Sequence, residues 1–179
     1  MHSGFSYLSE LVTEFFASTN VRRGFNVIYD CDISGWETWL QIEFAAFLSA
    51  HPSEPEWYRE WSVEYDRRME KRKNLLRPDF LIRKKGWYRE SYASIELKQA
   101  KSAKSCIRKL VNDIEKLDKA KYSSLEIRTA WVLGVFRRTS KAQVLQYARE
   151  ACEATGYEFD ENYVVNRVIP RTEYAYCFF

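Results

Sequence analysis

The sequence predicts an α/β domain in which helices flank a central mixed β-sheet. Segments of helical and strand periodicity follow one another in the order helices, three strands, helix, strand, helix, strands. The strand at 92–98, the helix at 102–121 and the strand at 126–136 form a crossover that is typical of parallel neighbouring strands. A length of 179 residues suits a single domain spanning residues 1–179.

The N-terminal part of the chain is expected to contain two helices. Residues 4–18 carry apolar side chains at helical spacing. A short connection at 20–24 then leads to residues 25–29, which are interpreted as a brief strand or an irregular link. Residues 36–50 form the second helix, which ends near His51-Pro52 because the residue before proline disfavours helical backbone.

One acidic residue lies in an unusual place on the helix at 36–50. A helical projection puts Glu43 in the middle of an apolar arc formed by Trp36, Trp39, Leu40, Phe44 and Phe47. Burying a carboxylate among apolar side chains is unfavourable unless a partner offsets its charge. Three interpretations of Glu43 are therefore open: a core salt bridge, a helix that is less buried than its pattern suggests, or a role at a metal ion, which explains its placement better.

Strands are expected in the middle of the chain. Residues 53–56 are interpreted as a linker, and Trp61–Met69 as an edge strand. Two further strands follow at 77–84 and 92–98, with Lys84-Lys85-Gly86 as the turn between them.

Alternation along these two strands predicts which side chains share a face. Asp79 lies opposite to Phe80, and Glu96 and Lys98 lie together, opposite to Leu97. If the two strands pair, the carboxylates of Asp79 and Glu96 approach each other, with the Lys98 ammonium one step along. Two carboxylates and a lysine at one edge of a sheet form a site for a divalent cation and a phosphate.

The C-terminal half supplies the crossover and the remaining elements. The helix at 102–121 has a basic N-terminal half, which opposes the helix dipole and favours a bound polyanion nearby. Residues 126–136 form a nearly continuous apolar run, as expected for a central buried strand. A helix at 140–155 closed by Gly156, and a hairpin of strands at 164–169 and 173–179, complete the chain.

Composition excludes several classes of protein. The chain has 4 Cys but no C-x-x-C motif and only 2 His, so a structural zinc site is not expected. The cysteines are expected to be reduced. No apolar run reaches the length of a membrane span, and no signal pattern begins the chain, so a cytoplasmic, non-membrane protein is expected.

The arrangement Pro78-Asp79, then Glu96-Leu97-Lys98, with Glu43 on a preceding helix, resembles the PD-(D/E)xK nuclease superfamily. The resemblance covers about residues 36–136. It implies the restriction-endonuclease-like αβββαβ core, with the helix at 4–18 and the C-terminal helix and strands as additions. The implied activity is metal-dependent phosphodiester hydrolysis, as in a DNA endonuclease.

The resemblance also implies a role for each matched residue. Asp79 and Glu96 would bind Mg²⁺ (or Mn²⁺), and the Leu97 carbonyl would add a ligand. Glu43 would bind a metal directly or through water. Lys98 would orient and help to deprotonate the attacking water. Its resting charge stays open, because burial and the adjacent carboxylates shift its pKa in opposite directions.

Basic residues near this motif are candidates for contacts with nucleic acid, expected to be DNA, through its phosphates. They are Arg67, Arg77, Lys101, Lys104 and Arg108, and the polar Gln99 is a further candidate. The alternative is a solvated charged surface. Two other functions remain open. One is a catalytically silent subunit on the same scaffold, which binds nucleic acid or a protein partner in a defence, repair or transposition complex. The other is RNA cleavage. A homodimer or larger complex is compatible with each.

Overall fold

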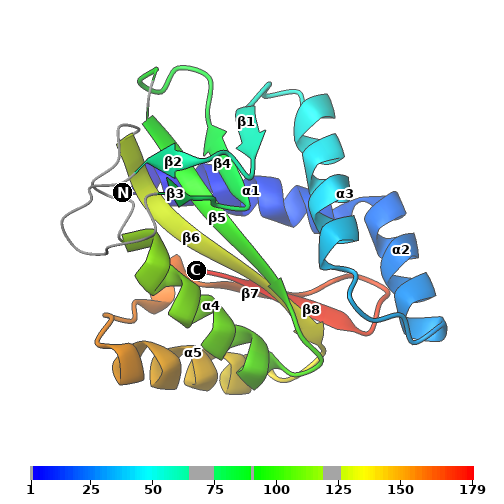
Figure 1. Ribbon diagram of the computed structural model, residues 1–179. Coiled ribbons are helices and arrows are strands. Elements are labelled where there is room, and N and C mark those ends of the chain that lie inside the picture. The colour runs from blue at the N-terminus through cyan, green and yellow to red at the C-terminus, as the bar shows by residue number, and fades with distance from the viewer. Residues whose placement is uncertain (1, 65–74, 90, 119–125) are drawn as a thin grey trace.

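The computed structural model describes residues 2–64, 75–89, 91–118 and 126–179. Within these residues the protein has a six-stranded mixed sheet with helices on both faces, and a separate two-stranded sheet (Figure 1). The helices are α1 (His2–Ala17), α2 (Thr19–Asp30), α3 (Glu37–Ala50), α4 (Ala103–Asp118) and α5 (Lys141–Thr155), with a short 3₁₀ helix η2 (Glu161–Tyr163). The strands are β1 (Glu56–Arg59), β2 (Val63–Glu64), β3 (Leu75–Leu76), β4 (Phe80–Arg83), β5 (Ser91–Gln99), β6 (Glu126–Arg137), β7 (Val165–Val168) and β8 (Tyr174–Phe178).

The main sheet has the strand order β1-β4-β5-β6-β8-β7. β4 pairs antiparallel with β5, with Phe80 opposite Ile95, whereas β5 and β6 run parallel and are connected through α4. β6, β8 and β7 are antiparallel neighbours. The β5–α4–β6 crossover, the central position of β6 and the C-terminal hairpin confirm the sequence predictions.

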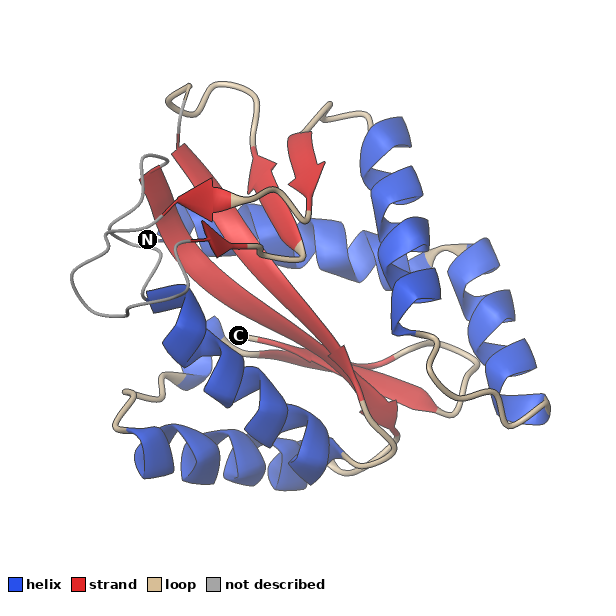
Figure 2. Ribbon diagram, viewed as in Figure 1, coloured by secondary structure: helices blue, strands red, loops and turns tan. Residues whose placement is uncertain are grey.

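The sheet separates two apolar cores. On one face, Phe80, Ile95 and Leu97 pack against α1, α2 and α3. On the other, Val132 and Phe136 pack against α4 and α5 (Figure 2). The predicted faces of β4 and β5 are therefore confirmed, and the face of Glu96 and Lys98 is the one that α4 covers.

A glycine lets α4 approach the sheet closely at this point. Gly134 of β6 lies beside Lys98 of β5, and a Cβ atom added to it would meet Leu110 Cδ1 at 2.6 Å and Cys106 Sγ at 2.9 Å. The Cys106 thiol also donates to the Lys98 carbonyl, at 3.6 Å. Gly134 thus lets α4 approach the end of β5 that carries Glu96 and Lys98.

The predicted helices at 4–18, 36–50, 102–121 and 140–155 correspond to α1, α3, α4 and α5. Gly156 ends α5 with φ of 76°, as expected for a left-handed C-cap. The interpretation of residues 20–29 as a connection with a strand or irregular link was wrong. They belong to α2, which Ser18 caps by accepting a hydrogen bond from the Val21 N–H, and whose inward face carries Phe25 and Ile28.

The edge strand is also placed differently from the prediction. The strand that pairs with β4 is β1, which begins at Glu56 directly after Pro55, so most of it lies beyond the expected linker at 53–56. Of the expected strand at 61–69, residues 63–64 form β2 in the small sheet, and residues 65–69 lie outside the described residues. A proline lacks the backbone donor of a sheet ladder, which suits the start of an edge strand.

No helix in the described parts of the chain is long and apolar enough to cross a membrane.

Candidate active site

Asp79 lies one residue before β4, and both of its carboxylate oxygens are fixed by hydrogen bonds. Oδ2 accepts from the backbone N–H of Leu97 on β5, at 2.7 Å. Oδ1 accepts from Nε2 of Gln41 on α3, at 3.0 Å. The carboxylate is therefore held between the backbone of β5 and the side chain of α3.

Glu96 and Lys98 project from the α4-facing side of β5. The Lys98 ammonium lies 3.9 Å from a Glu96 oxygen, 3.4 Å from Asp113 of α4 and 3.9 Å from Glu37 of α3. The side chains of Glu96 and Asp113 are 13% and 12% exposed, so these charges are largely removed from water. We call Glu37, Asp79, Glu96 and Asp113, with Lys98 between them, the carboxylate cluster.

Two residues of α3, one helical turn apart, hold the cluster from the side of the helix. Gln41 accepts from the Arg59 guanidinium, at 2.8 Å, which leaves its amide nitrogen to donate to Asp79. Glu37 accepts from the backbone N–H of Gln99 at 3.1 Å with one oxygen, and its other oxygen faces Lys98. Glu37 also lies in the first turn of α3, where the helix dipole favours a negative charge.

The electrostatics of the cluster are those of crowded negative charges. Burial raises the pKa of Asp79, and the Leu97 N–H and the Lys98 charge offset this only in part. Burial, followed by repulsion from Asp79, raises the pKa of Glu96 to about 8. The two carboxyl groups lie close together, and the raised pKa of Glu96 favours its protonated form near neutral pH.

Lys98 stays charged in this setting. Burial lowers its pKa, but the carboxylates of Asp79, Glu37, Glu96 and Asp113 outweigh burial and raise it. Without a further cation, Lys98 is therefore an ammonium that balances charge. It is not poised to accept a proton from water.

The pair of Asp79 and Glu96 fits a divalent cation of the Mg²⁺ type. Among the residues that the structure describes, no group of three or more His, Cys, Asp or Glu side chains forms a metal cage. Mg²⁺ does not need one, since it keeps several waters and is held by one or two carboxylates and a substrate phosphate. A cation held between these two carboxylates would offset the charge that otherwise favours a proton on Glu96.

The structure brings together Asp79, Glu96 and Lys98 from the predicted site, with the Leu97 backbone beside Asp79. It does not bring Glu43 to them. Glu43 is partly exposed, and no hydrogen bond or ion pair within the described residues connects it to the other three. The buried face of α3 carries Leu40, Gln41, Phe44 and Leu48 and is centred about a third of a turn from Glu43.

The expected centre of the apolar arc was wrong because α3 packs on two sides. Trp36 and Trp39 lie against Phe25 of α2, with ring centroids at 5.3 and 5.4 Å. The two tryptophans of the arc therefore mark the contact with α2, whereas Phe44 and Phe47 pack on Phe15 of α1. The side of α3 that faces β5 carries the polar Glu37 and Gln41.

Glu37, Gln41 and Asp113 were not assigned to the site from the sequence. A usable signal was present, since Glu37 and Gln41 continue in steps of three and four into the apolar Phe44 and Leu48. Polar residues in line with an apolar stripe indicate a helix that runs from a core into a site. Asp113 lies on the helix predicted at 102–121 and forms an ion pair with Lys98.

The predicted phosphate contacts divide into separate places. Gln99 and Lys101 line a pocket beside the carboxylate cluster, whereas Lys104 and Arg108 line a groove between α4 and α5. Arg77 is exposed, and its Nε donates to Ser62 Oγ at 2.8 Å. Arg67 lies outside the described residues.

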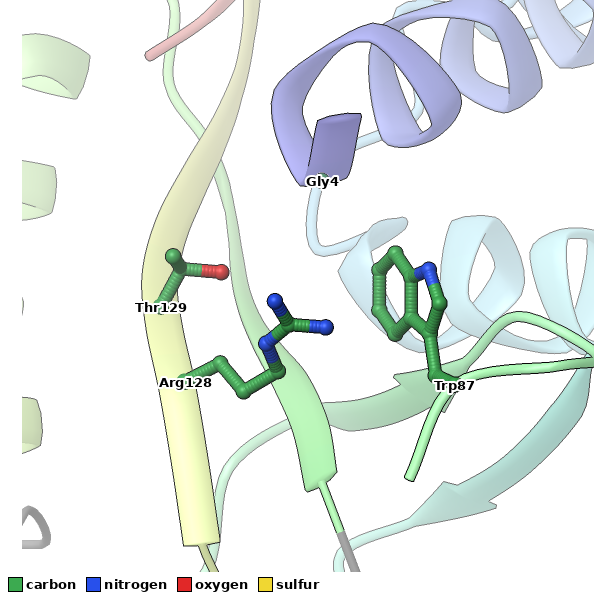
Figure 3. A pocket seen from close by; sticks show the side chains of 4 residues that line it. All are labelled: Gly4, Trp87, Arg128 and Thr129. Carbon is green, nitrogen blue, oxygen red and sulfur yellow. The ribbon is translucent and has the colours of Figure 1, made fainter. Parts of the chain in front are cut away.

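A third hollow, of about 120 Å³, lies where the N-terminal ends of α1 and β6 meet (Figure 3). Figure 3 shows the Arg128 guanidinium between Thr129 and Trp87, and the Trp87 ring centroid is 5.1 Å from the guanidinium carbon. Gly4 completes the described lining. These residues include no carboxylate and no activated nucleophile, so this hollow has no second set of candidate catalytic residues in its described lining.

Comparisons of the chain with family models, with curated proteins and with solved structures find no match.

Proposed function

We propose that this protein is a metal-dependent nuclease of the PD-(D/E)xK type that hydrolyses phosphodiester bonds, with DNA as the expected substrate. The observation that carries the proposal is the geometry of the carboxylate cluster: Asp79 is fixed against the Leu97 N–H of β5, and the Lys98 ammonium lies 3.9 Å from Glu96 and 3.4 Å from Asp113. The order α3, β1, β4, β5, α4, β6 supports a restriction-endonuclease-like core, with β2 and β3 as an insertion.

In this proposal, Asp79 and Glu96 hold Mg²⁺ or Mn²⁺. When bound, the ion supplies Lewis-acid stabilisation of the phosphate charge and a lowered pKa for a bound water. Lys98 neutralises charge on the scissile phosphate and orients the attacking water. Gln41 and the Leu97 N–H keep the Asp79 carboxylate in one orientation, so that the site does not need to reorganise during the reaction.

Glu37 and Asp113 act through Lys98 as positioning residues. They approach the ammonium from α3 and from α4, which restricts its movement relative to Glu96. We include Glu37 in the site in the place on α3 that was expected for Glu43.

The test is cleavage of supercoiled and linear DNA, and of RNA, by the purified chain in Mg²⁺, in Mn²⁺ and in a chelator. We expect metal-dependent cleavage of DNA that Asp79→Ala and Lys98→Ala each abolish, with the circular dichroism spectrum retained. Glu43→Ala serves as the control on the same helix as Glu37. Cleavage that persists in both the Asp79 and the Lys98 variants would contradict the proposal.

The alternative on the same scaffold is a protein that binds nucleic acid without cutting it. The observation that favours this is the placement of the Lys98 ammonium within 4 Å of Glu37, Glu96 and Asp113, whose charges help to keep the amine protonated in the cation-free site. Salt-sensitive binding with no turnover in either metal would select this alternative.

A further inference from the structure

A basic pocket lies immediately beside the carboxylate cluster. It has a volume of about 240 Å³ and is located where β5 and β6 end and α4 begins. Its cations are Lys101, Lys109 and Arg137, against one carboxylate, Asp32. We call this hollow the basic pocket. Its charge is opposite to that of the neighbouring cluster, so it suits an anion.

Arg137 is held in a fixed orientation at the wall of the basic pocket. Its guanidinium carbon lies 4.2 Å from the ring centroid of Tyr29 and 4.9 Å from that of Tyr174. Asp32 is 3.9 Å from one terminal nitrogen. A guanidinium fixed between aromatic rings offers its donors in a planar fork that matches phosphate oxygens, with little entropy left to lose on binding.

Two structural features connect the basic pocket to the carboxylate cluster. Glu37 contacts Lys98 with one oxygen and the N–H of Gln99, a residue of the pocket wall, with the other. Along α4, Lys109 of the pocket precedes Asp113 of the cluster by four residues, an axial step of about 6 Å. An extended polyanion such as a nucleic-acid strand can therefore contact the basic pocket and the carboxylate cluster at the same time.

We propose that the basic pocket binds a second phosphate of the nucleic-acid strand whose scissile phosphate lies at Lys98. The proposal rests on the proposed function for the identity of the strand. Lys101 and Lys109 attract the phosphate, and Arg137 grips it through its fork. Such contacts hold the strand in register without reading its bases.

The other basic side of α4 provides a matched comparison. Lys104 and Arg108 line the groove between α4 and α5 and belong to neither the basic pocket nor the carboxylate cluster. All four side chains are exposed, so replacing them should leave the fold intact. Removing two positive charges from either side changes the net charge of the protein by the same amount.

The experiment measures binding of a fluorescent single-stranded oligonucleotide by anisotropy over a range of salt concentrations, in an Asp79→Asn background that separates binding from cleavage. We expect Lys101→Gln with Lys109→Gln to weaken binding about tenfold and to reduce the salt slope by about 1–2. Lys104→Gln with Arg108→Gln should change the affinity less than about twofold. Melting temperatures of the variants check folding.

Arg137→Lys tests the fork, because it keeps the charge and removes the planar geometry. It should weaken binding at unchanged salt slope, and a variant that binds like the parent would contradict the role given to Arg137. Poly-glutamate that competes as well as the unlabelled oligonucleotide would overturn the choice of a phosphate ligand.

The outcomes separate this inference from the proposed function. If the two double variants weaken binding equally while the wild type cleaves DNA, phosphate binding at the basic pocket is contradicted and the nuclease proposal stands. If binding depends on the basic pocket but the wild type does not cleave, the nuclease proposal is contradicted and phosphate binding at the basic pocket stands. Absence of both binding and cleavage overturns both.

Discussion

Two charged clusters lie at opposite ends of the β4–β5 pair, and their charges are balanced in opposite ways. At one end, Glu56 of β1 accepts hydrogen bonds from Arg83, Tyr58 and Tyr92. The Tyr92 hydroxyl and then Arg83 lower the pKa of Glu56. At the other end, burial and Asp79 raise the pKa of Glu96 to about 8.

The donors around Glu56 satisfy its charge within the protein, so the fold gains stability from it. At Glu96, burial and repulsion from Asp79 outweigh the attraction of Lys98 for the ionised form. Under the proposed function, a bound cation offsets this unfavourable charge in place of a proton.

The largest expected contrast is in activity. Glu96→Gln should lower the cleavage rate about 1000-fold or more, because removing a metal ligand sacrifices several kcal/mol of charge stabilisation in the transition state. Above about pH 8, where Glu96 is ionised, the same variant should melt at a higher temperature than the metal-free wild type, since a buried like charge is removed. Glu56→Gln, the same replacement at the other end, should keep most of the activity and melt at a lower temperature. Rate measurements and thermal melts check both. Equal losses of activity would contradict the contrast.

The next effect concerns stability. Glu56→Ala leaves Arg83, Tyr58 and Tyr92 without their acceptor and should cost about 1–2 kcal/mol. For a domain of this size that lowers Tm by about 2–4 °C per kcal/mol. Glu54→Ala is the control, because the pair of Glu54 with Lys85 is exposed and should leave Tm unchanged. A Tm unchanged in both variants would show that the Glu56 cluster does not stabilise the fold.

The two clusters should also respond to pH with opposite signs. The pKa of Glu96 is raised in the folded state from 4.5 to about 8, so without metal the folded state binds the proton more tightly. Its contribution to the free energy of unfolding therefore increases as pH falls from about 8 to 4.5. The pKa of Glu56 is lowered from 4.5, so its contribution is present above that pH and is lost as pH falls through the folded-state value.

Denaturant unfolding at several pH values, with Glu96→Gln and Glu56→Gln compared to the wild type, separates the two contributions. The difference between Glu96→Gln and the wild type should shrink as pH falls from 8, whereas that for Glu56→Gln should shrink only below 4.5. Parallel curves for the wild type and Glu96→Gln would contradict the raised pKa.

The smallest effect is stabilisation by the metal itself. A cation that binds only the folded state with a dissociation constant near 1 mM stabilises the protein at 10 mM by about 1.4 kcal/mol. Mg²⁺ should therefore raise Tm by a few degrees in the wild type at pH 8 and not in Asp79→Ala. The same ionic strength supplied as NaCl is the control. An identical shift with NaCl would indicate screening instead of binding.

The strands of the site could be predicted from the sequence because the pattern that defines them is local. Alternation of residues along β4 and β5 determines the faces of Asp79, Glu96 and Lys98, and the crossover through α4 determines that β5 and β6 are parallel. These features depend on neighbouring residues and on general rules of chain connection.

The helix α3 shows where sequence information ends. Its apolar residues serve two contacts, one with the sheet and one with α2, and a helical projection cannot separate them. Trp39 packs so tightly over Gly24 of α2 that a Cβ atom there would collide with its ring. Because residues 25–29 were interpreted as a link or strand, the contact between α3 and α2 could not be predicted. Glu43 was therefore assigned to the site instead of Glu37 and Gln41. Which side of a helix faces a site depends on tertiary packing.

The most direct test of the central claim is a crystal of the protein soaked in Mn²⁺ with data collected for anomalous scattering. The account predicts an anomalous peak bound by carboxylate oxygens of both Asp79 and Glu96, at about 2.0–2.2 Å from them, and its loss in Asp79→Ala. A peak at any other place, or no peak at Asp79 and Glu96 in saturating Mn²⁺, would contradict the account.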